Sequence, residues 1–117
     1  MPERSPETRY DCLPENPCAV LELIVNNHPG VMSQVCGLLA RRAFNVEAIL
    51  CLPIASDKGE HSRIWLLMDA VRPLDQMIKQ VAKLQDVLQI RKLQANRDVF
   101  LEVEKLMTLD LSYEMTA

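Results

Sequence analysis

The stretch that decides the fold is residues 25–46, VNNHPGVMSQVCGLLARRAFNV. An apolar run ends at Val25, polar turn formers follow, and apolar residues then recur at helical spacing. This pattern predicts a strand end, a tight loop, a helix over residues 30–43 and the entry to a second strand.

The loop of this stretch is the candidate ligand site. Pro29 is expected at the first helical position, where its missing N–H is not needed. Gly30 has no side chain, so a ligand can approach the backbone closely. A helix start also offers unpaired N–H groups and the positive end of the helix dipole, which suit a small carboxylate or phosphate. The sequence therefore predicts a regulatory module that binds a small amino acid here.

Size, charge and composition narrow the class of protein. The 117 residues suffice for one modest domain. A net charge of −3 and an aromatic content of 4% argue against a nucleic-acid partner, which needs basic surfaces and stacking platforms. No apolar run approaches the roughly 20 residues of a membrane helix, and the N-terminus lacks a signal-peptide core. These observations predict a cytoplasmic protein.

The cysteines do not predict a metal site. None of the four forms a CxxC pair, and zinc would need closer ligand spacing. Cys18, Cys36 and Cys51 lie inside apolar stretches, where a free thiol behaves as a small hydrophobe. We expect reduced, mostly buried thiols.

The remaining elements follow from the same kind of pattern. Residues 1–17, rich in proline and charge, are expected to form a mobile leader. Strands are predicted over 18–26, 44–53, 62–69 and 87–93, a second helix from Pro73, and a third helix over 98–109. Alternation along the strands predicts that Val46 and Ala48 share one face of the second strand, and that Leu88 and Ile90 of the fourth strand face inward.

The order strand, helix, strand, strand, helix, strand predicts an α+β fold of the ferredoxin-like βαββαβ type. Its four-stranded antiparallel sheet should have the strand order 4-1-3-2, with both helices on one face. The domain is expected over residues 18–94, followed by a helical tail over 95–117. Two alternatives are open for the tail helix: it packs against its own domain, or it docks on a partner.

The motifs NNHPGVMSQVCGLLARRAFNVEAILCLP, HSRIWLLM and VLQIRKL resemble an ACT domain, and within that group the small regulatory subunit of acetohydroxyacid synthase (acetolactate synthase). The resemblance covers residues 18–94. It implies that two such domains pair through sheet edges and enclose a branched-chain amino acid, usually valine. It also implies that the dimer binds and activates the large catalytic subunit and confers feedback inhibition of branched-chain amino acid biosynthesis.

The resemblance implies that this chain is not an enzyme. Thiamine diphosphate, Mg²⁺ and FAD would all belong to the catalytic subunit, and this chain would hold none of them. It also implies effector contacts at Asn27, at Gly30 with the backbone of Val31 and Met32, and at Asn45.

The chemistry of valine agrees with those positions. Its carboxylate suits the N–H groups of the helix start, and its ammonium needs acceptors such as the side-chain oxygens of Asn27 and Asn45. Its isopropyl group needs an apolar wall, for which Met32 and Ile49 are the candidates. Pro29 completes the predicted loop site. Apart from the resemblance, Asn26 and Asn27 are interpreted equally well as ordinary turn residues, and His28 as a solvent-exposed loop residue.

Two departures from the family pattern stand out. Many members have glycine before the aromatic residue of the second strand, where this chain has Ala43. Many also carry a separate C-terminal domain, whereas this sequence stops at Ala117 and resembles the short type.

The sheet face without helices is predicted to be a partner surface. Its expected residues are Glu22, Ile24, Glu47, Ile49, Trp65, Leu67, Gln89 and Arg91. This set of residues is too apolar for a surface exposed only to solvent and too charged for a buried core. An aromatic side chain at the centre of such a surface is typical of a contact with a partner. We therefore predict that Trp65 lies at the contact with the catalytic subunit; the alternative is that it faces the helices as core. Arg41 and Arg42 form either a solvated face or a further docking site.

Other functions have less support. There is no nucleophile–base pairing, metal-ligand cluster or GxxxxGK phosphate loop for an enzyme. An RNA binder would need several aromatics and a basic sheet face, and a metal carrier would need paired cysteines in the first loop. The remaining alternative is a ferredoxin-like interaction module that binds a different small amino acid, or activates a partner without an effector.

Overall fold

The computed structural model describes residues 18–70, 73–93 and 98–111. The predicted leader over 1–17 therefore lies outside the described residues. The elements in chain order are β1 (Cys18–Asn26), α1 (Val31–Arg41), β2 (Val46–Pro53), a 3-10 turn η2 (Ala55–Asp57), β3 (His61–Asp69), α2 (Asp75–Ala82), β4 (Val87–Leu93) and α3 (Asp98–Leu111). None of the described helices is long and apolar enough to span a membrane.

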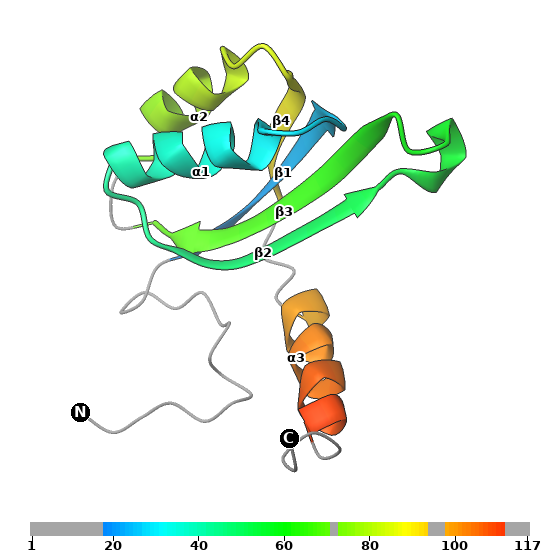
Figure 1. Cartoon of the computed structure of the whole chain (residues 1–117). Helices are drawn as coiled ribbons and strands as arrows, with labels where there is room; N and C mark the ends of the chain where they lie inside the picture. Colours follow the sequence, from blue (N-terminus) through cyan, green and yellow to red (C-terminus); the bar gives the residue numbers. More distant parts are fainter. Residues whose placement is uncertain (1–17, 71–72, 94–97, 112–117) are drawn as a thin grey trace, which may run out of the picture.

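The sheet has the order β2-β3-β1-β4 with antiparallel pairing throughout, which confirms the predicted topology. Figure 1 shows α1 and α2 together on one face of the sheet and α3 on the other. We call these the helix face and the open face. Because β1 and β3 are central, β2 and β4 present the two edges.

Alternation along β1 sets which side chains are buried under the helices. Leu21, Leu23 and Val25 belong to the main core, which α1 and α2 cover. Glu22 points the other way and lies opposite Trp65 and Arg91 on the neighbouring strands. The sequence prediction for this strand is confirmed.

An irregularity in β2 overturns part of the prediction for that strand. The register shifts between Val46 and Ala48, so Glu47 lies at a bulge. Val46 consequently packs against the helix-face core, whereas Ala48 packs on the open face, although one face was predicted for both. Ile49 pairs with the core residue Leu66, so its predicted place on the open face is wrong.

A second irregularity changes β4. The register shifts between Ile24 and Val25, whose partners are Gln89 and Val87. Leu88 has no partner in that register and is 54% exposed, whereas Val87 is buried. The expectation that Leu88 faces inward is therefore wrong, because the period-2 pattern breaks at the bulge.

Both helices begin later than their prolines predict. Gly30 is the N-cap of α1, and Pro29 precedes it in the turn. The N-cap of α2 is Leu74, so Pro73 also lies before the cap rather than at the first helical position.

The thiol prediction is only partly right. Cys36 and Cys51 are free, but Cys51 is exposed rather than buried. Cys18 is disulfide-bonded, contrary to the expectation of reduced thiols.

The end of α1 gives a physical reason why glycine would suit the position of Ala43 better than alanine does. Ala43 has φ 61°, and the N–H of Phe44 donates to the carbonyl of Leu39 at 3.1 Å. This is the Schellman arrangement, in which the residue after the C-cap adopts the left-handed conformation. A side chain other than glycine is strained there by roughly 1–2 kcal/mol.

Replacing Ala43 with glycine should therefore stabilise the domain. The relief of strain is partly offset by the larger entropy of glycine in the unfolded chain, so we expect a net gain of about 0.5–1 kcal/mol in the free energy of unfolding. Urea unfolding measures it. The matched control is Ala40→Gly, at an exposed position inside α1, which should lose about 1 kcal/mol. Equal losses in both variants would contradict this account of the helix end.

Candidate functional site: the corner between β1 and α1

The start of α1 is open. Gly30 has φ 92°, and its carbonyl accepts the N–H of Gln34 at 3.0 Å. No side chain caps the helix, and its first turn has no acidic residue. A Cβ added to Gly30 would meet nothing within 4 Å. The N–H groups of the first turn and the positive end of the dipole therefore have no side-chain cap, and Val31 and Met32 line the cavity at this corner.

A cavity of about 230 Å³ lies at this corner. Its lining residues are Val25, Asn26, Asn27, His28, Pro29, Gly30, Val31, Met32, Cys51, Ser62 and Ile64. A water molecule occupies about 30 Å³ of the liquid, so the space suits a ligand of several heavy atoms. The five predicted loop residues of the site thus lie together, and no side chain of the described residues fills the corner.

Asn27 ties the loop to the hairpin between β2 and β3. Its backbone N–H donates to the carbonyl of Glu60 at 3.0 Å, and its side-chain Nδ2 donates to the carbonyl of Gly59 at 2.7 Å. These bonds fix the orientation of the amide. They leave its oxygen, Oδ1, as the acceptor available to a bound cation.

A second tether joins the loop to the turn before β4. Asn26 Nδ2 donates to Asp86 Oδ1 at 3.2 Å, and His28 Nε2 donates to Asp86 Oδ2 at 2.7 Å. His28 Nδ1 donates to the carbonyl of Pro29 at 2.7 Å. Both ring nitrogens thus face acceptors, which favours the imidazolium with both protons present.

The ionisation of both groups follows from these contacts. The carbonyl of Pro29, followed by the Asp86 carboxylate, raises the pKa of His28. The hydrogen bond from Asn26, followed by that from His28, lowers the pKa of Asp86. Sequence reasoning missed this tether, because Asp86 lies sixty positions along the chain from Asn26 and no local pattern links them.

The tether makes stability depend on pH in a defined direction. A raised His28 pKa contributes stability below the ordinary value of 6.5, and that contribution is lost as the pH rises through the raised value. The lowered Asp86 pKa contributes above 3.8 and is lost only in acid. We expect the urea midpoint of the wild-type protein to fall relative to His28→Gln between about pH 6 and about pH 8. Other titrating groups are common to both proteins, so a difference that does not change with pH would contradict the tether.

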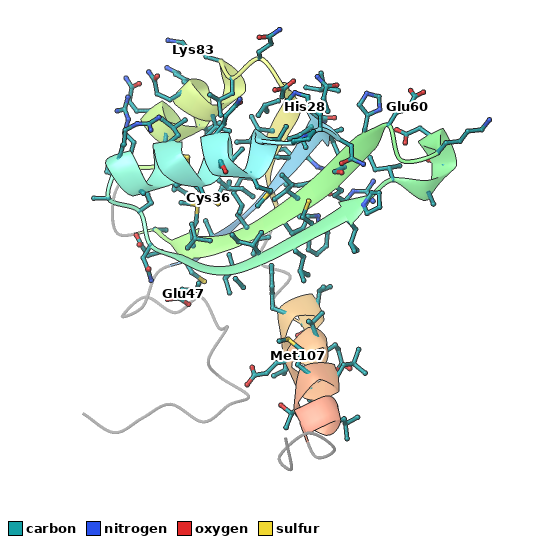
Figure 2. The ribbon with its side chains drawn as sticks, in the orientation of Figure 1. His28, Cys36, Glu47, Glu60, Lys83 and Met107 are labelled. Carbon is teal, nitrogen blue, oxygen red and sulfur yellow. The ribbon has the colours of Figure 1, made fainter. Side chains whose placement is uncertain are left out.

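Asn45 and Ile49 do not line this cavity within one chain. The N–H of Asn45 donates to Asp69 Oδ2 at 2.7 Å, which holds it beside the last residue of β3. The cavity residue Ser62 is near the first residue of that strand, and strands rise about 3.3 Å per residue. In Figure 2, His28 and Glu60 lie at one end of the sheet, and Glu47 at the other.

The predicted docking residues fall on two different surfaces. Trp65 lies on the open face, where its Nε1 donates to Glu22 Oε2 at 2.8 Å, so the alternative that it faces the helices is wrong. Arg41 and Arg42 are exposed at the end of α1, on the helix face.

The third helix combines the two readings proposed for it. Phe100 is buried on the open face, with its ring centroid 6.5 Å from that of Trp65. Leu106, Met107 and Leu109 further along α3 are exposed. The first turn of α3 therefore packs on its own domain, and the rest presents apolar side chains to solvent.

A four-stranded antiparallel sheet of βαββαβ order with both of its helices on one face is the architecture of an ACT domain. The chain belongs to the family described as the AHAS small subunit-like ACT domain, whose model matches residues 21–89. Acetolactate synthase isozyme 1 small subunit of Escherichia coli K12 is 55% identical over 81 residues, which cover 69% of this chain and 82% of that protein.

More distant relatives agree. The acetolactate synthase small subunit of Mycobacterium avium is 33% identical over 84 residues, which cover 71% of this chain and 49% of that protein. The crystal structure of the Thermotoga maritima small subunit superimposes with a TM-score of 0.56 at 29% identity, covering 69% of this chain and 50% of that one. The ACT domain of a GTP pyrophosphokinase from Chlorobium tepidum, with a TM-score of 0.55 at 17% identity, shares the fold.

Proposed function

We propose that this chain is a regulatory subunit of acetohydroxyacid synthase that binds valine in the corner between β1 and α1. The observation that supports the proposal most strongly is the uncapped start of α1, which opens into a cavity lined by both apolar and polar groups. The family and the 55% identical relative, itself a small subunit, point in the same direction.

Valine fits the cavity chemically. Its carboxylate would accept hydrogen bonds from the N–H groups of Val31 and Met32 at the positive end of the helix. Its ammonium would donate to Asn27 Oδ1. Ile64 and the Met32 side chain would surround the isopropyl group. Polar groups in a tight site discriminate between ligands more strongly than apolar walls do. The site should therefore bind an amino acid much more tightly than the corresponding keto acid, but valine only somewhat more tightly than alanine.

A second copy of the chain would supply the residues missing from the cavity. β2 is an edge strand with exposed residues, including Ile49 at 39%. Antiparallel pairing of two β2 strands about a two-fold axis sets the start of each strand beside the end of the other. Asn45 of the second copy would then lie near Pro53, close to the cavity residue Cys51. Ile49, near the middle of β2, would lie close to the axis.

The rest of the proposal rests on the family. The dimer would bind the large catalytic subunit, raise its activity and confer feedback inhibition by valine. Catalysis, and with it thiamine diphosphate, Mg²⁺ and FAD, would belong to that large subunit in the cytoplasm. Among the described residues there is no group of three or more histidine, cysteine, aspartate or glutamate side chains placed to hold a metal ion.

Titration calorimetry with the purified chain tests the effector. We expect heat of binding with valine and none with 2-ketoisovalerate, the keto acid of the same carbon skeleton. That compound lacks the ammonium group whose hydrogen bond Asn27 Oδ1 would accept. Absence of heat with valine, leucine and isoleucine alike would reject the effector site. The interaction module that activates a partner without an effector would then be the better account.

A further inference from the structure

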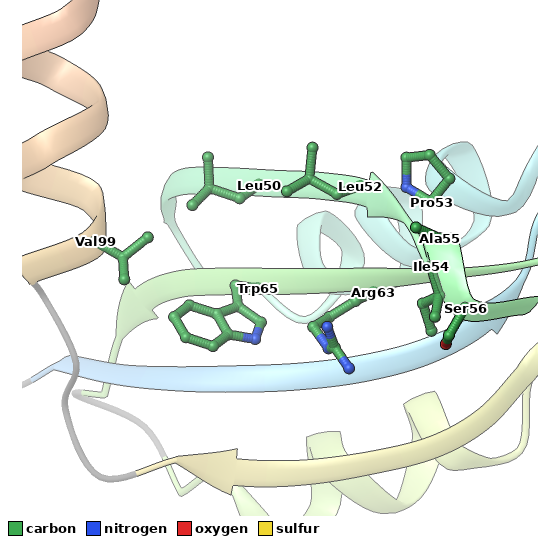
Figure 3. Close-up of a pocket in the computed structure, with 9 residues that line it drawn as sticks. All are labelled: Leu50, Leu52, Pro53, Ile54, Ala55, Ser56, Arg63, Trp65 and Val99. Atoms are coloured by element: carbon green, nitrogen blue, oxygen red, sulfur yellow. The ribbon is translucent and has the colours of Figure 1, made fainter. Parts of the chain in front are cut away.

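A groove of about 450 Å³ crosses the open face of the sheet, on the side away from the loop cavity. Its lining residues are Leu50, Leu52, Pro53, Ile54, Ala55, Ser56, Arg63, Trp65 and Val99. Figure 3 shows Leu50 and Trp65 near Val99, which comes from the first turn of α3, with Pro53 and Ser56 at the other end. The helix therefore bounds one end of the groove, and the hairpin after β2 bounds the other.

The floor and the edge of the groove are apolar. Trp65 and Leu50 are half-buried there, and Leu52 on the edge strand is 66% exposed. A hollow, contiguous apolar surface beside polar groups is typical of a contact with another protein. Trp65 is also the only tryptophan of the chain, and tryptophan is enriched among the residues that dominate binding energy.

A charged cluster flanks this apolar floor. Glu22 is nearly buried, and its carboxylate accepts hydrogen bonds from Trp65 Nε1 and from Arg91 Nε, each at 2.8 Å. Arg63 Nε lies 3.4 Å from the same carboxylate. Burial alone would raise the pKa of Glu22, but the hydrogen bonds from Trp65 and Arg91, with the charge of both arginines, lower it. The carboxylate is therefore ionised at neutral pH.

The cluster has one positive charge in excess and free donors. Two guanidinium groups face a single carboxylate, and both arginine side chains are more than half exposed. Each guanidinium has five N–H donors, of which the contacts to Glu22 use the Nε–H. The remaining donors are suited to paired hydrogen bonds with a second carboxylate.

We propose that this groove docks a segment of the catalytic subunit that combines apolar side chains with an acidic residue. The apolar side chains would cover Leu52 and Trp65, and the carboxylate would pair with Arg63 and Arg91. The inference rests on the proposed function for the identity of the partner. The chemistry of the segment follows from the charge and shape of the groove.

Leu52→Asp tests the apolar floor. It places a charge on an already exposed side chain, so the fold should persist, and the affinity for the purified cognate catalytic subunit should fall at least about tenfold because the charge would be desolvated on docking. The matched control is Leu88→Asp, at a leucine of similar exposure outside the groove, which should bind like the wild type. Arg63→Gln should weaken binding less and reduce its dependence on salt.

The single tryptophan gives a direct readout of occupancy. In a chain labelled with 5-fluorotryptophan, the ¹⁹F resonance of Trp65 should shift when unlabelled catalytic subunit is added. Valine alone should shift it far less, because the loop cavity lies on the other face. The heat of valine binding should be the same in Arg63→Gln as in the wild type, because Arg63 lies on the central strand β3 and does not line the loop cavity.

Three results would overturn the inference: a ¹⁹F resonance that does not respond to the catalytic subunit, unchanged affinity in both Leu52→Asp and Arg63→Gln, or a loss of self-association in Leu52→Asp by sedimentation with partner affinity retained. The last would make the groove a contact between copies of this chain. A wild-type chain that does not bind the catalytic subunit at all would instead reject the proposed function.

Discussion

Asn27→Ala is expected to weaken valine binding by about 10- to 100-fold. The substitution removes the oxygen proposed to accept the ammonium, and a hydrogen bond to a charged group contributes about 1.5–3 kcal/mol. It also removes the bond from Asn27 Nδ2 to the carbonyl of Gly59, which ties the loop to the hairpin between β2 and β3. A factor of ten in affinity corresponds to about 1.4 kcal/mol.

Calorimetry with valine measures the loss, and the matched control is Gln89→Ala. Gln89 is an exposed amide on β4, away from the cavity, and its removal should leave valine affinity unchanged. Urea unfolding of both variants separates loss of the ligand contact from loss of the fold. Valine affinity in Asn27→Ala equal to that of the wild type would show that the amide is only a turn residue.

Leu23→Ala is expected to have the largest effect on stability. Leu23 is fully buried in the middle of β1, between Ile64 on β3 and Ile90 on β4. Truncating a buried leucine removes its transfer free energy and leaves a cavity. The free energy of unfolding should therefore fall by about 3 kcal/mol, within a usual range of about 2–5 kcal/mol. The whole free energy of unfolding of a small domain is only about 5–15 kcal/mol, so this loss is a large part of it.

Denaturant unfolding at a fixed temperature measures the loss. The control is Leu88→Ala, because Leu88 is 54% exposed and its truncation should change stability by no more than about 0.5 kcal/mol. Equal losses at the two leucines would mean that the register of β1 or β4 is not as described.

The fold was predictable wherever one local period held without interruption. The alternation of Leu21, Glu22 and Leu23 places the first and last of these under the helices and the carboxylate on the open face. The prediction failed at Glu47 and Leu88, where an extra residue in the strand shifts the register. Such a bulge depends on how two strands pair, and the sequence of one strand does not contain that information.

The candidate site was predictable to the same extent. Turn residues and a glycine before a helical pattern located the loop, because those signals are local. The tethers of the loop were missed, since they join Asn27 to Gly59 and His28 to Asp86 across the fold. Cys51 was also missed as a lining residue, because its apolar neighbours in the sequence predict a buried thiol, whereas it is exposed beside the cavity.

Two chains with different defects provide the most direct test of the proposed shared site. In the proposed site, one copy of the chain contributes Asn27 and the other contributes Asn45. Asn27→Ala removes the first contact and Asn45→Ala removes the second, so each variant alone should bind valine weakly. When the two are mixed and allowed to exchange, a mixed dimer has one site with both asparagines intact. The account predicts that calorimetry of the mixture recovers a population of sites with wild-type affinity. A mixture that binds no better than its two components would contradict a site built from two copies.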